Sequence, residues 1–317
     1  MKSNEGSSQK SSKENLCGRA SKELDCTTSP FQWWYEIDEP STIRLGLHLR
    51  LLHAENTGFQ KLEIYEHDLL GRILILDDIL QTTQADEFIY HEMVCHIPLL
   101  GSAFIAREDY HPEVLIIGGG DGGLLREVLN HARVQRVVMV ELDEAVIRAS
   151  KQFLNIHGNF EDPRVNLIIG DGFEYVGRAS THEHPFDVIL VDSSDPVGPG
   201  ESLFSAHFYK SLGQCLKPHG VMVRHLGLPH IQKSIFIAGV RRLAQAFKGI
   251  QIFRATIPSY IGGEMGFAAC TRDGHAIDVP YRNYTGRYYN TAMHRAAFAL
   301  PTSWQQMLAD LVPITGE

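Results

Sequence analysis

The sequence predicts an α/β protein in which a small antiparallel β unit precedes a doubly wound parallel sheet. Short alternating strands separated by turns occupy the first part of the chain. From Val114 onward, apolar strand-like runs alternate with helix-like segments, which is the pattern of a parallel sheet covered by helices. A glycine-rich loop, residues 118–123, directly follows the first apolar run, where open α/β sheets bind their ligands.

Composition narrows the class of protein. The 317 residues are 44% hydrophobic and carry 29 Lys and Arg against 38 Asp and Glu, a formal net charge of −9. Basic blocks are absent, so we expect no nucleic-acid partner, and no apolar run approaches the ~20 residues of a membrane span. The N-terminal residues form no apolar run, so we expect no secretory leader, and the five cysteines are scattered without a CxxC pair. We therefore expect a cytoplasmic protein without disulfides or a metal site.

The first part of the chain divides into a tail and a β domain. Residues 1–30 are rich in Ser, Lys, Glu and Asn, so we expect a flexible N-terminal tail. Residues 31–104 are expected to form a domain of β-hairpins with a linking helix. Its strands are predicted at residues 62–65, 72–76 and 79–82, and its helix at residues 86–100.

Residues 105–317 are predicted to form the second, catalytic domain. Buried strands are expected at residues 114–117, 137–140, 165–169 and 188–191. Helices are expected between the first three of these strands, at residues 124–131 and 144–154. These elements are followed by a helix at 208–215, a strand at 220–224, a helix at 231–247 and strands at 250–256 and 266–270.

Two acids follow the last of the parallel strands. Asp192 and Asp195 are three residues apart in a stretch stiffened by Pro196, Gly198 and Pro199. Paired carboxylates at the carboxyl end of such a strand suit a cationic substrate, or one of them can act as a general base. The alternative is an ordinary turn, because Asp, Ser, Pro and Gly are common turn residues.

The glycine-rich loop predicts a ligand that contains a nucleoside. Glu141 closes the second strand at about the distance past the loop (~20 residues) at which an acid binds ribose hydroxyls. Asp121 inside the loop would repel a pyrophosphate, which argues against a dinucleotide. An adenosine with a cationic tail fits instead, as in S-adenosylmethionine or its decarboxylated form. Asp171 and Gly172 end the third strand and could hold the adenine, although this pair is also common in turns.

Further polar candidates lie outside these loops. Tyr90 and His91 belong to a helix too polar to be buried without partners, so they face either solvent or the cleft. Tyr260 lies two residues after Pro258, and its side chain either lines the pocket or packs against other side chains.

Together, these motifs resemble those of the polyamine aminopropyltransferases, and most closely those of the spermidine synthases. The similarity covers about residues 33–305, and its motifs lie at residues 81–83, 86–93, 118–123, 141, 171–172, 192–204, 256–260 and 288–298. The resemblance implies a Rossmann-like, methyltransferase-type domain behind a small N-terminal β domain, and a homodimer or homotetramer. It also implies transfer of the aminopropyl group of decarboxylated S-adenosylmethionine to a diamine such as putrescine. Spermidine and 5′-methylthioadenosine would be the products, with no further cofactor and no metal.

The resemblance also implies roles for individual residues. Asp192 would accept the proton of the attacking amine, and Tyr90 would orient its nitrogen. The substrate-binding residues would be Gln60, His91, Asp121, Glu141, Asp171, Gly172, Asp195, Pro199 and Tyr260. Among these, Asp195 and Tyr260 would bind the amine and Glu141 the ribose.

One departure leaves the acceptor open. Spermidine synthases usually carry a glutamine-containing segment near the far end of the amine pocket, where this chain has Arg224 and His225. Agmatine, cadaverine or a longer polyamine are therefore alternatives to putrescine, although we expect Arg224 to point to solvent. Asp78 also replaces the usual glycine of a Leu-Asp-Gly turn. An S-adenosylmethionine-dependent methyltransferase and a catalytically silent polyamine-binding homologue are the alternatives from other classes.

Overall fold

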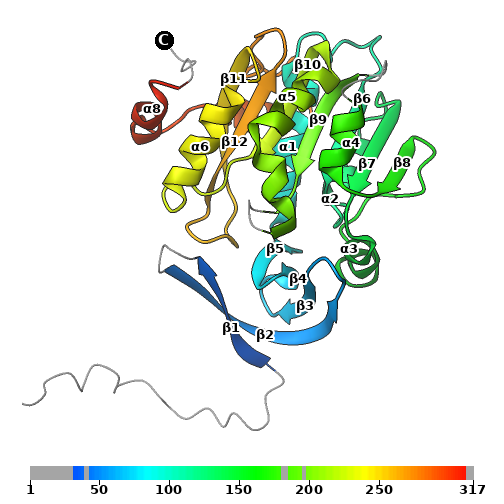
Figure 1. The fold of residues 1–317 in the computed structure, drawn as a ribbon, viewed down its shortest axis with the longest axis vertical. Helices are drawn as coiled ribbons and strands as arrows, with labels where there is room; N and C mark the ends of the chain where they lie inside the picture. The colour runs from blue at the N-terminus through cyan, green and yellow to red at the C-terminus, as the bar shows by residue number, and fades with distance from the viewer. Residues whose placement is uncertain (1–30, 39–42, 180–184, 195–197, 312–317) are drawn as a thin grey trace, which may run out of the picture.

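A computed structural model describes residues 31–38, 43–179, 185–194 and 198–311. It contains two sheets, one above the other, with helices packed mainly on the larger one (Figure 1). Among the described residues, no helix is both long and apolar enough to span a bilayer.

The N-terminal sheet is an antiparallel meander in the order β1-β2-β3-β4-β5. Its strands are β1 (Phe31–Asp38), β2 (Ile43–Asn56), β3 (Lys61–His67), β4 (Gly71–Leu76) and β5 (Ile79–Thr83). The turn from β4 to β5 is made by Asp77 and Asp78, with φ of 48° and 62°. Asp tolerates this left-handed region better than most residues, so both Asp77 and Asp78 fit this turn.

The second sheet has the order β11-β12-β10-β9-β6-β7-β8. Its strands are β6 (Glu113–Gly118), β7 (Arg136–Glu141), β8 (Val165–Ile169), β9 (Phe186–Asp192), β10 (Leu216–His225), β11 (Gly249–Thr256) and β12 (Glu264–Thr271). The five neighbouring strands β10, β9, β6, β7 and β8 are parallel to one another. At one edge, β12 pairs antiparallel with β10, and β11 pairs antiparallel with β12. The chain leaves β6 first toward β7 and later returns to β9 on the other side. This order makes the β6/β9 boundary a topological switch point, where such sheets bind ligands.

Helices cover both faces of this sheet, which explains the continuous apolar runs of its strands. On one face lie α1 (Glu87–Gly101), α2 (Gly123–Leu129) and α7 (Thr291–Ala297). On the other lie α4 (Gly172–Ala179), α5 (Ala206–Cys215), α6 (Lys233–Leu243) and α8 (Thr302–Leu308). Figure 1 shows α4, α5 and α6 in front of the sheet and α1 behind it.

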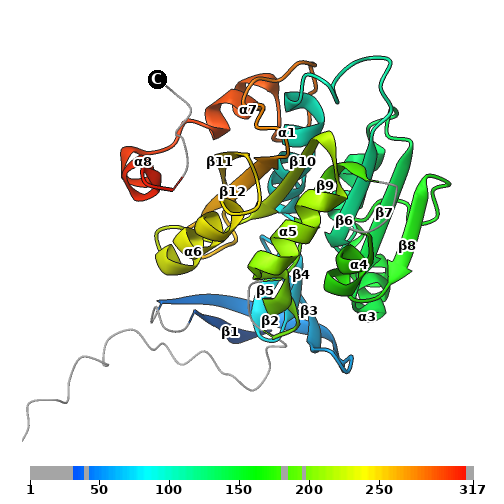
Figure 2. The same cartoon turned by 45° about the horizontal axis from the view of Figure 1, so that its top comes forward.

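The two sheets are joined through α3 (Glu144–Ala149) and the π-helical turn Ser150–Leu154 that continues it. Val146 and Leu154 pack with Leu62, Ile64 and Leu74 of the N-terminal sheet in one buried cluster. Figure 2 shows α3 beside β3, next to the carboxyl ends of β7 and β8. The N-terminal sheet is thereby held over the end of the larger sheet where the ligand loops lie.

The predicted fold class is confirmed, with differences in detail. Helix α4 was not expected, the two last strands are antiparallel, and α6 is shorter than the predicted 231–247. Helix α1, expected to belong to the first domain, packs its apolar residues against the second sheet.

Candidate active site

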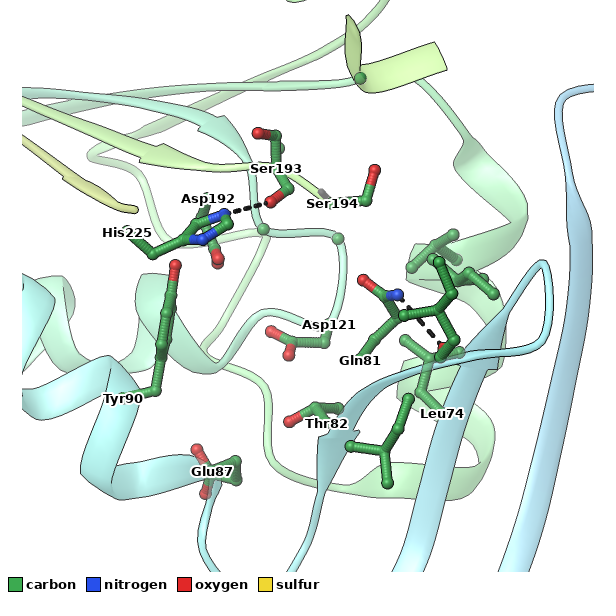
Figure 3. A pocket seen from close by; sticks show the side chains of 18 of the residues that line it. Leu74, Gln81, Thr82, Glu87, Tyr90, Asp121, Asp192, Ser193, Ser194 and His225 are labelled. Carbon is green, nitrogen blue, oxygen red and sulfur yellow. Dashed lines mark hydrogen bonds between the residues drawn. The ribbon is translucent and has the colours of Figure 1, made fainter. Parts of the chain in front are cut away.

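A cavity lies between the N-terminal sheet and the carboxyl ends of β6, β7 and β9 (Figure 3). Both sheets and α1 contribute to its wall. Of the residues selected from the sequence, it brings together Gln60, Tyr90, His91, Asp121, Glu141, Asp171, Gly172, Asp192 and Tyr260. Asp195 lies outside the described residues, as does the side chain of Pro199.

The glycine-rich loop lies directly against the backbone of Asp192. Gly118 and Gly119 have φ of 81° and 76°, which favours glycine at both positions. The Gly119 amide donates to the Asp192 carbonyl at 2.9 Å, and a Cβ at Gly118 would collide with that carbonyl. These contacts fix the end of β9 beside the loop, so Asp192 is aimed at whatever the loop binds.

The Asp192 carboxylate has an acidic neighbour. One side-chain oxygen each of Asp192 and Asp121 and a ring nitrogen of His91 lie within 4.8 Å of one another. Burial, followed by the charge of Asp121, raises the pKa of Asp192 to about 6. A carboxylate that titrates near neutral pH is suited to accept a proton.

His91 carries positive charge between two carboxylates. Its Nδ1 lies 2.6 Å from Glu87 Oε2, and its Nε2 lies 3.5 Å from Asp121 Oδ2. Burial opposes the charge, but Asp121 and Glu87 outweigh it and raise the pKa of His91 well above its ordinary value. Burial also opposes ionisation of Asp121, yet His91 holds the pKa of this carboxyl below its usual range. Asp121 is therefore a permanent anion in the cavity.

The Tyr90 hydroxyl is buried and points toward Asp192 (Figure 3). Its polar neighbour is the Asp192 carboxylate, although among the described residues the pair falls short of normal hydrogen-bond geometry. Burial and the charge of Asp192 raise its pKa well above the ordinary value, so it stays a neutral donor. A buried hydroxyl without a protein partner is costly unless a ligand or water completes it.

Glu141 and its neighbours form a second wall at the end of β7. Glu141 Oε1 accepts the Asp143 amide at 2.9 Å, and burial raises the pKa of Glu141 to about 7. Gln60 Nε2 donates to Asp143 Oδ2 at 3.0 Å, which brings the turn before β3 to this wall. Gly172 is buried nearby, whereas Asp171 is exposed and caps α4 by accepting the Phe173 amide at 2.7 Å.

The wall opposite is formed by the turn after β11. Asp86 accepts the Ser259 amide at 2.8 Å and the Ser259 hydroxyl at 3.0 Å. The Tyr260 hydroxyl donates to the carbonyl of Gln81, a residue of β5, at 2.6 Å. These bonds tie the turn to both sheets and hold the Tyr260 ring on the cavity wall.

The expectation that Arg224 points to solvent is wrong. Its side chain is 0% exposed, on the side of β10 that faces α5. The sequence analysis also gave no site role to several residues of the cavity wall, namely Glu36, Gln81, Ser193, Leu203 and Gln232. Gln81, Ser193 and Leu203 lie inside the resembling motifs but were given no individual role, whereas Glu36 and Gln232 lie outside every motif and reach the cavity only through tertiary structure.

Comparison with known proteins decides the family. A family model described as spermine/spermidine synthase domain matches residues 87–279, and one described as spermidine synthase tetramerisation domain matches residues 32–84. The chain belongs to the spermine/spermidine synthase family.

Relatives of the family cover most of the chain. The polyamine aminopropyltransferase of Sodalis glossinidius is 42% identical over 262 residues, which are 79% of this chain and 88% of that protein. Polyamine aminopropyltransferase 1 of Pseudomonas aeruginosa is 44% identical over 262 residues, with the same coverage of 79% and 88%. These names confirm the expected enzyme class, a transferase.

Solved structures of this family share the fold. A spermidine synthase in complex with the transition-state analogue AdoDATO gives a TM-score of 0.79 at 33% identity, over 88% of this chain and 95% of that one. Spermidine synthase from Thermotoga maritima gives 0.78 at 32% identity, over 92% and 99%. The predicted family and fold class are thus confirmed together.

Proposed function

We propose that this enzyme transfers the aminopropyl group of decarboxylated S-adenosylmethionine to putrescine, which gives spermidine and 5′-methylthioadenosine. The observation that carries the proposal is the pair Asp192 and Asp121, within 4.8 Å of each other in the cavity of an aminopropyltransferase fold. Two carboxylates with opposite pKa shifts suit a reaction that needs one base and one permanent anion.

The base is required because an alkylammonium has no free electron pair. In the proposed reaction, ionised Asp192 takes a proton from the acceptor ammonium, and the Tyr90 hydroxyl orients the freed nitrogen. The nitrogen lone pair then attacks the aminopropyl carbon bonded to sulfur. The C–S bond breaks and its electron pair returns to the sulfonium, which leaves as a neutral thioether and needs no acid. The products are a secondary ammonium and methylthioadenosine.

The other polar groups are proposed to align the two cationic substrates. Asp121, held ionised by His91, would bind the primary ammonium of the aminopropyl group. Glu141 would hold the ribose, with Gln60 on the same wall through Asp143. Asp171, Gly172 and Pro199 would frame the adenine and thioether end. Tyr260 and Asp195 would bind the acceptor amine. Decarboxylated S-adenosylmethionine is a co-substrate, and we propose no further cofactor.

We further propose a homodimer or homotetramer built on the N-terminal sheet. Trp33, Tyr35, Ile43 and Leu51 of β1 and β2 are 64%, 51%, 42% and 50% exposed, an unusual number of large apolar side chains on one hairpin. The match of residues 32–84 to a tetramerisation domain supports this assignment. Domain boundaries at residues 31–104 and 105–317 are retained as proposals, and the N-terminal tail expected at residues 1–30 lies outside the described residues.

A cytoplasmic location also remains a proposal, based on cysteine usage. Cys95, Cys215 and Cys270 are free and buried, as expected for a protein of a reducing compartment.

The acceptor is tested with purified protein, decarboxylated S-adenosylmethionine and equal concentrations of putrescine, cadaverine, agmatine and spermidine. Mass spectrometry quantifies each aminopropylated amine, and kcat/KM ranks the acceptors. We expect putrescine to rank first. A higher kcat/KM for another amine would overturn the acceptor. Methyl transfer from intact S-adenosylmethionine, or polyamine binding without turnover, would overturn the reaction itself.

A further inference from the structure

Two consecutive residues near the end of β10 contact both ends of the segment that follows Asp192. Successive side chains of a strand point to opposite faces of the sheet. Arg224 accordingly faces α5 and Tyr209, whereas His225 faces the cavity and the Tyr90 ring, 6.3 Å away between centroids. The pair is therefore placed to act on the site from two sides.

His225 holds the peptide next to Asp192. Its Nε2 donates to the Ser193 carbonyl at 2.8 Å (Figure 3), and a carbonyl can only accept, so Nε2 carries the hydrogen. The preceding carbonyl, that of Asp192, accepts the Gly119 amide at 2.9 Å. The backbone carbonyls of Asp192 and Ser193 are therefore both held by hydrogen bonds. A carboxylate on a backbone held in this way has few orientations left.

Arg224 holds His225 and the far end of the segment together. Its Nε donates to the His225 carbonyl at 3.1 Å, and its Nη1 donates to the Leu203 carbonyl at 2.8 Å and to the Tyr209 hydroxyl at 2.7 Å. The guanidinium carbon lies 3.8 Å from the centroid of the Phe204 ring. Leu203 is itself part of the cavity wall.

The complete burial of Arg224 makes these contacts important. A fully buried guanidinium is costly unless its donors find partners, and here Nε and Nη1 donate to backbone and aromatic groups of three elements. A continuous series of hydrogen bonds thus runs from Tyr209 through Arg224 and His225 to Ser193, the residue after the proposed base.

We propose that Arg224 and His225 are positioning residues for aminopropyl transfer. His225 orients the Asp192 carboxylate through Ser193, and Arg224 fixes His225 and the Leu203 wall through their carbonyls. This inference rests on the proposed function, since Asp192 is there the base. Neither residue touches the reacting atoms in this assignment.

The test compares variants that keep or remove single donors. His225→Gln retains an N–H at similar reach, whereas His225→Leu removes it. Arg224→Met keeps the length of the side chain without its donors. We expect His225→Leu and Arg224→Met to lower kcat about 10- to 100-fold, the scale of small misplacements of a catalytic group. His225→Gln should stay within about threefold of wild type, and methylthioadenosine should bind all variants with Kd within about twofold.

The matched control is Arg164→Met. Arg164 also donates to backbone carbonyls, those of Leu129, His131 and Val134, but it lies outside the cavity wall. Its loss is expected to lower the melting temperature without changing kcat. A merely structural role of Arg224 would give the same pattern for Arg224→Met and would overturn the inference. Equal loss in His225→Gln and His225→Leu would overturn it as well.

A readout that needs no turnover separates this inference from the function. NMR titration of the Asp192 carboxyl carbon is expected to give a lower midpoint in His225→Leu than in wild type, because a released carboxylate reaches water. In His225→Gln the wild-type midpoint is expected. An unchanged midpoint in His225→Leu contradicts the positioning role, whereas a wild-type protein that aminopropylates no amine contradicts only the proposed function.

Discussion

The carboxylate of Asp192 lies within 4.8 Å of the carboxylate of Asp121, yet the two are driven to opposite protonation behaviour. Burial and the charge of Asp121 raise the pKa of Asp192, while His91 overcomes the effect of burial and lowers that of Asp121. The protein thereby places one permanent anion beside one proton acceptor. This difference in protonation between the two carboxyl groups is the physical basis of the predictions that follow.

Replacement of the base should stop chemistry and spare nucleoside binding. In Asp192→Asn we expect kcat to fall about 100- to 10,000-fold, the usual contribution of a general base. The Kd for methylthioadenosine, from isothermal titration calorimetry, should change little. Asp68→Asn, at an exposed turn, is the control for loss of one carboxylate. Near-normal turnover in Asp192→Asn would show that another group takes the proton.

The rate should fall in mild acid. Asp192 must be ionised to act, and its pKa is about 6, so kcat/KM for the amine should fall as pH drops through about 6. Because the charge of Asp121 raises this pKa, Asp121→Asn should move the acidic midpoint of the profile downward. Initial rates measured from pH 5 to 9 provide the check, and an upward shift would contradict the assigned coupling.

The Tyr90 hydroxyl should matter for turnover and not for stability. Tyr90→Phe removes a buried hydroxyl whose polar neighbour, Asp192, lies outside normal hydrogen-bond geometry, so the melting temperature should change little. We expect kcat/KM for the amine to fall about 10-fold, the worth of one hydrogen bond to a reacting group. In the control Tyr289→Phe, whose hydroxyl bonds His294 Nδ1 at 2.6 Å, the pattern should reverse.

Glu141 should make the unliganded protein less stable at higher pH. Its folded pKa, about 7, exceeds the ordinary 4.5, so this group's contribution to stability is present below pH 4.5 and is lost as pH rises through 7. Glu141→Gln should therefore raise the melting temperature at pH 8 and leave it nearly unchanged at pH 4.5, with weaker methylthioadenosine binding. The exposed Glu174→Gln is the control. An equal effect at both pH values would contradict the raised pKa.

The positions of Asp192, Asp121 and Glu141 could be predicted from the sequence because each follows an apolar run that forms a parallel strand. The carboxyl ends of such strands share one edge of the sheet, so order along the chain is enough to bring these groups together. The polarity of its helix predicted only that Tyr90 faces either solvent or the cleft, and its place in the site was an implication of the family resemblance.

Arg224 shows what such patterns cannot supply. A lone arginine at the end of an apolar strand is expected to reach solvent, and its burial depends on the Leu203 carbonyl and Tyr209 hydroxyl, which belong to other elements. The pattern of polar and apolar residues along a strand does not indicate which groups of other elements will contact it. Helix α4 was missed for a local reason, because it is short and contains Gly177.

The most direct test of the central assignment is the stoichiometry of one reaction. Purified protein is incubated with decarboxylated S-adenosylmethionine and putrescine, and methylthioadenosine and spermidine are quantified by mass spectrometry. We expect the two products to appear in equal amounts, with none formed from intact S-adenosylmethionine. Methylthioadenosine without spermidine, or no product at all, would contradict aminopropyl transfer to putrescine as the reaction of this site.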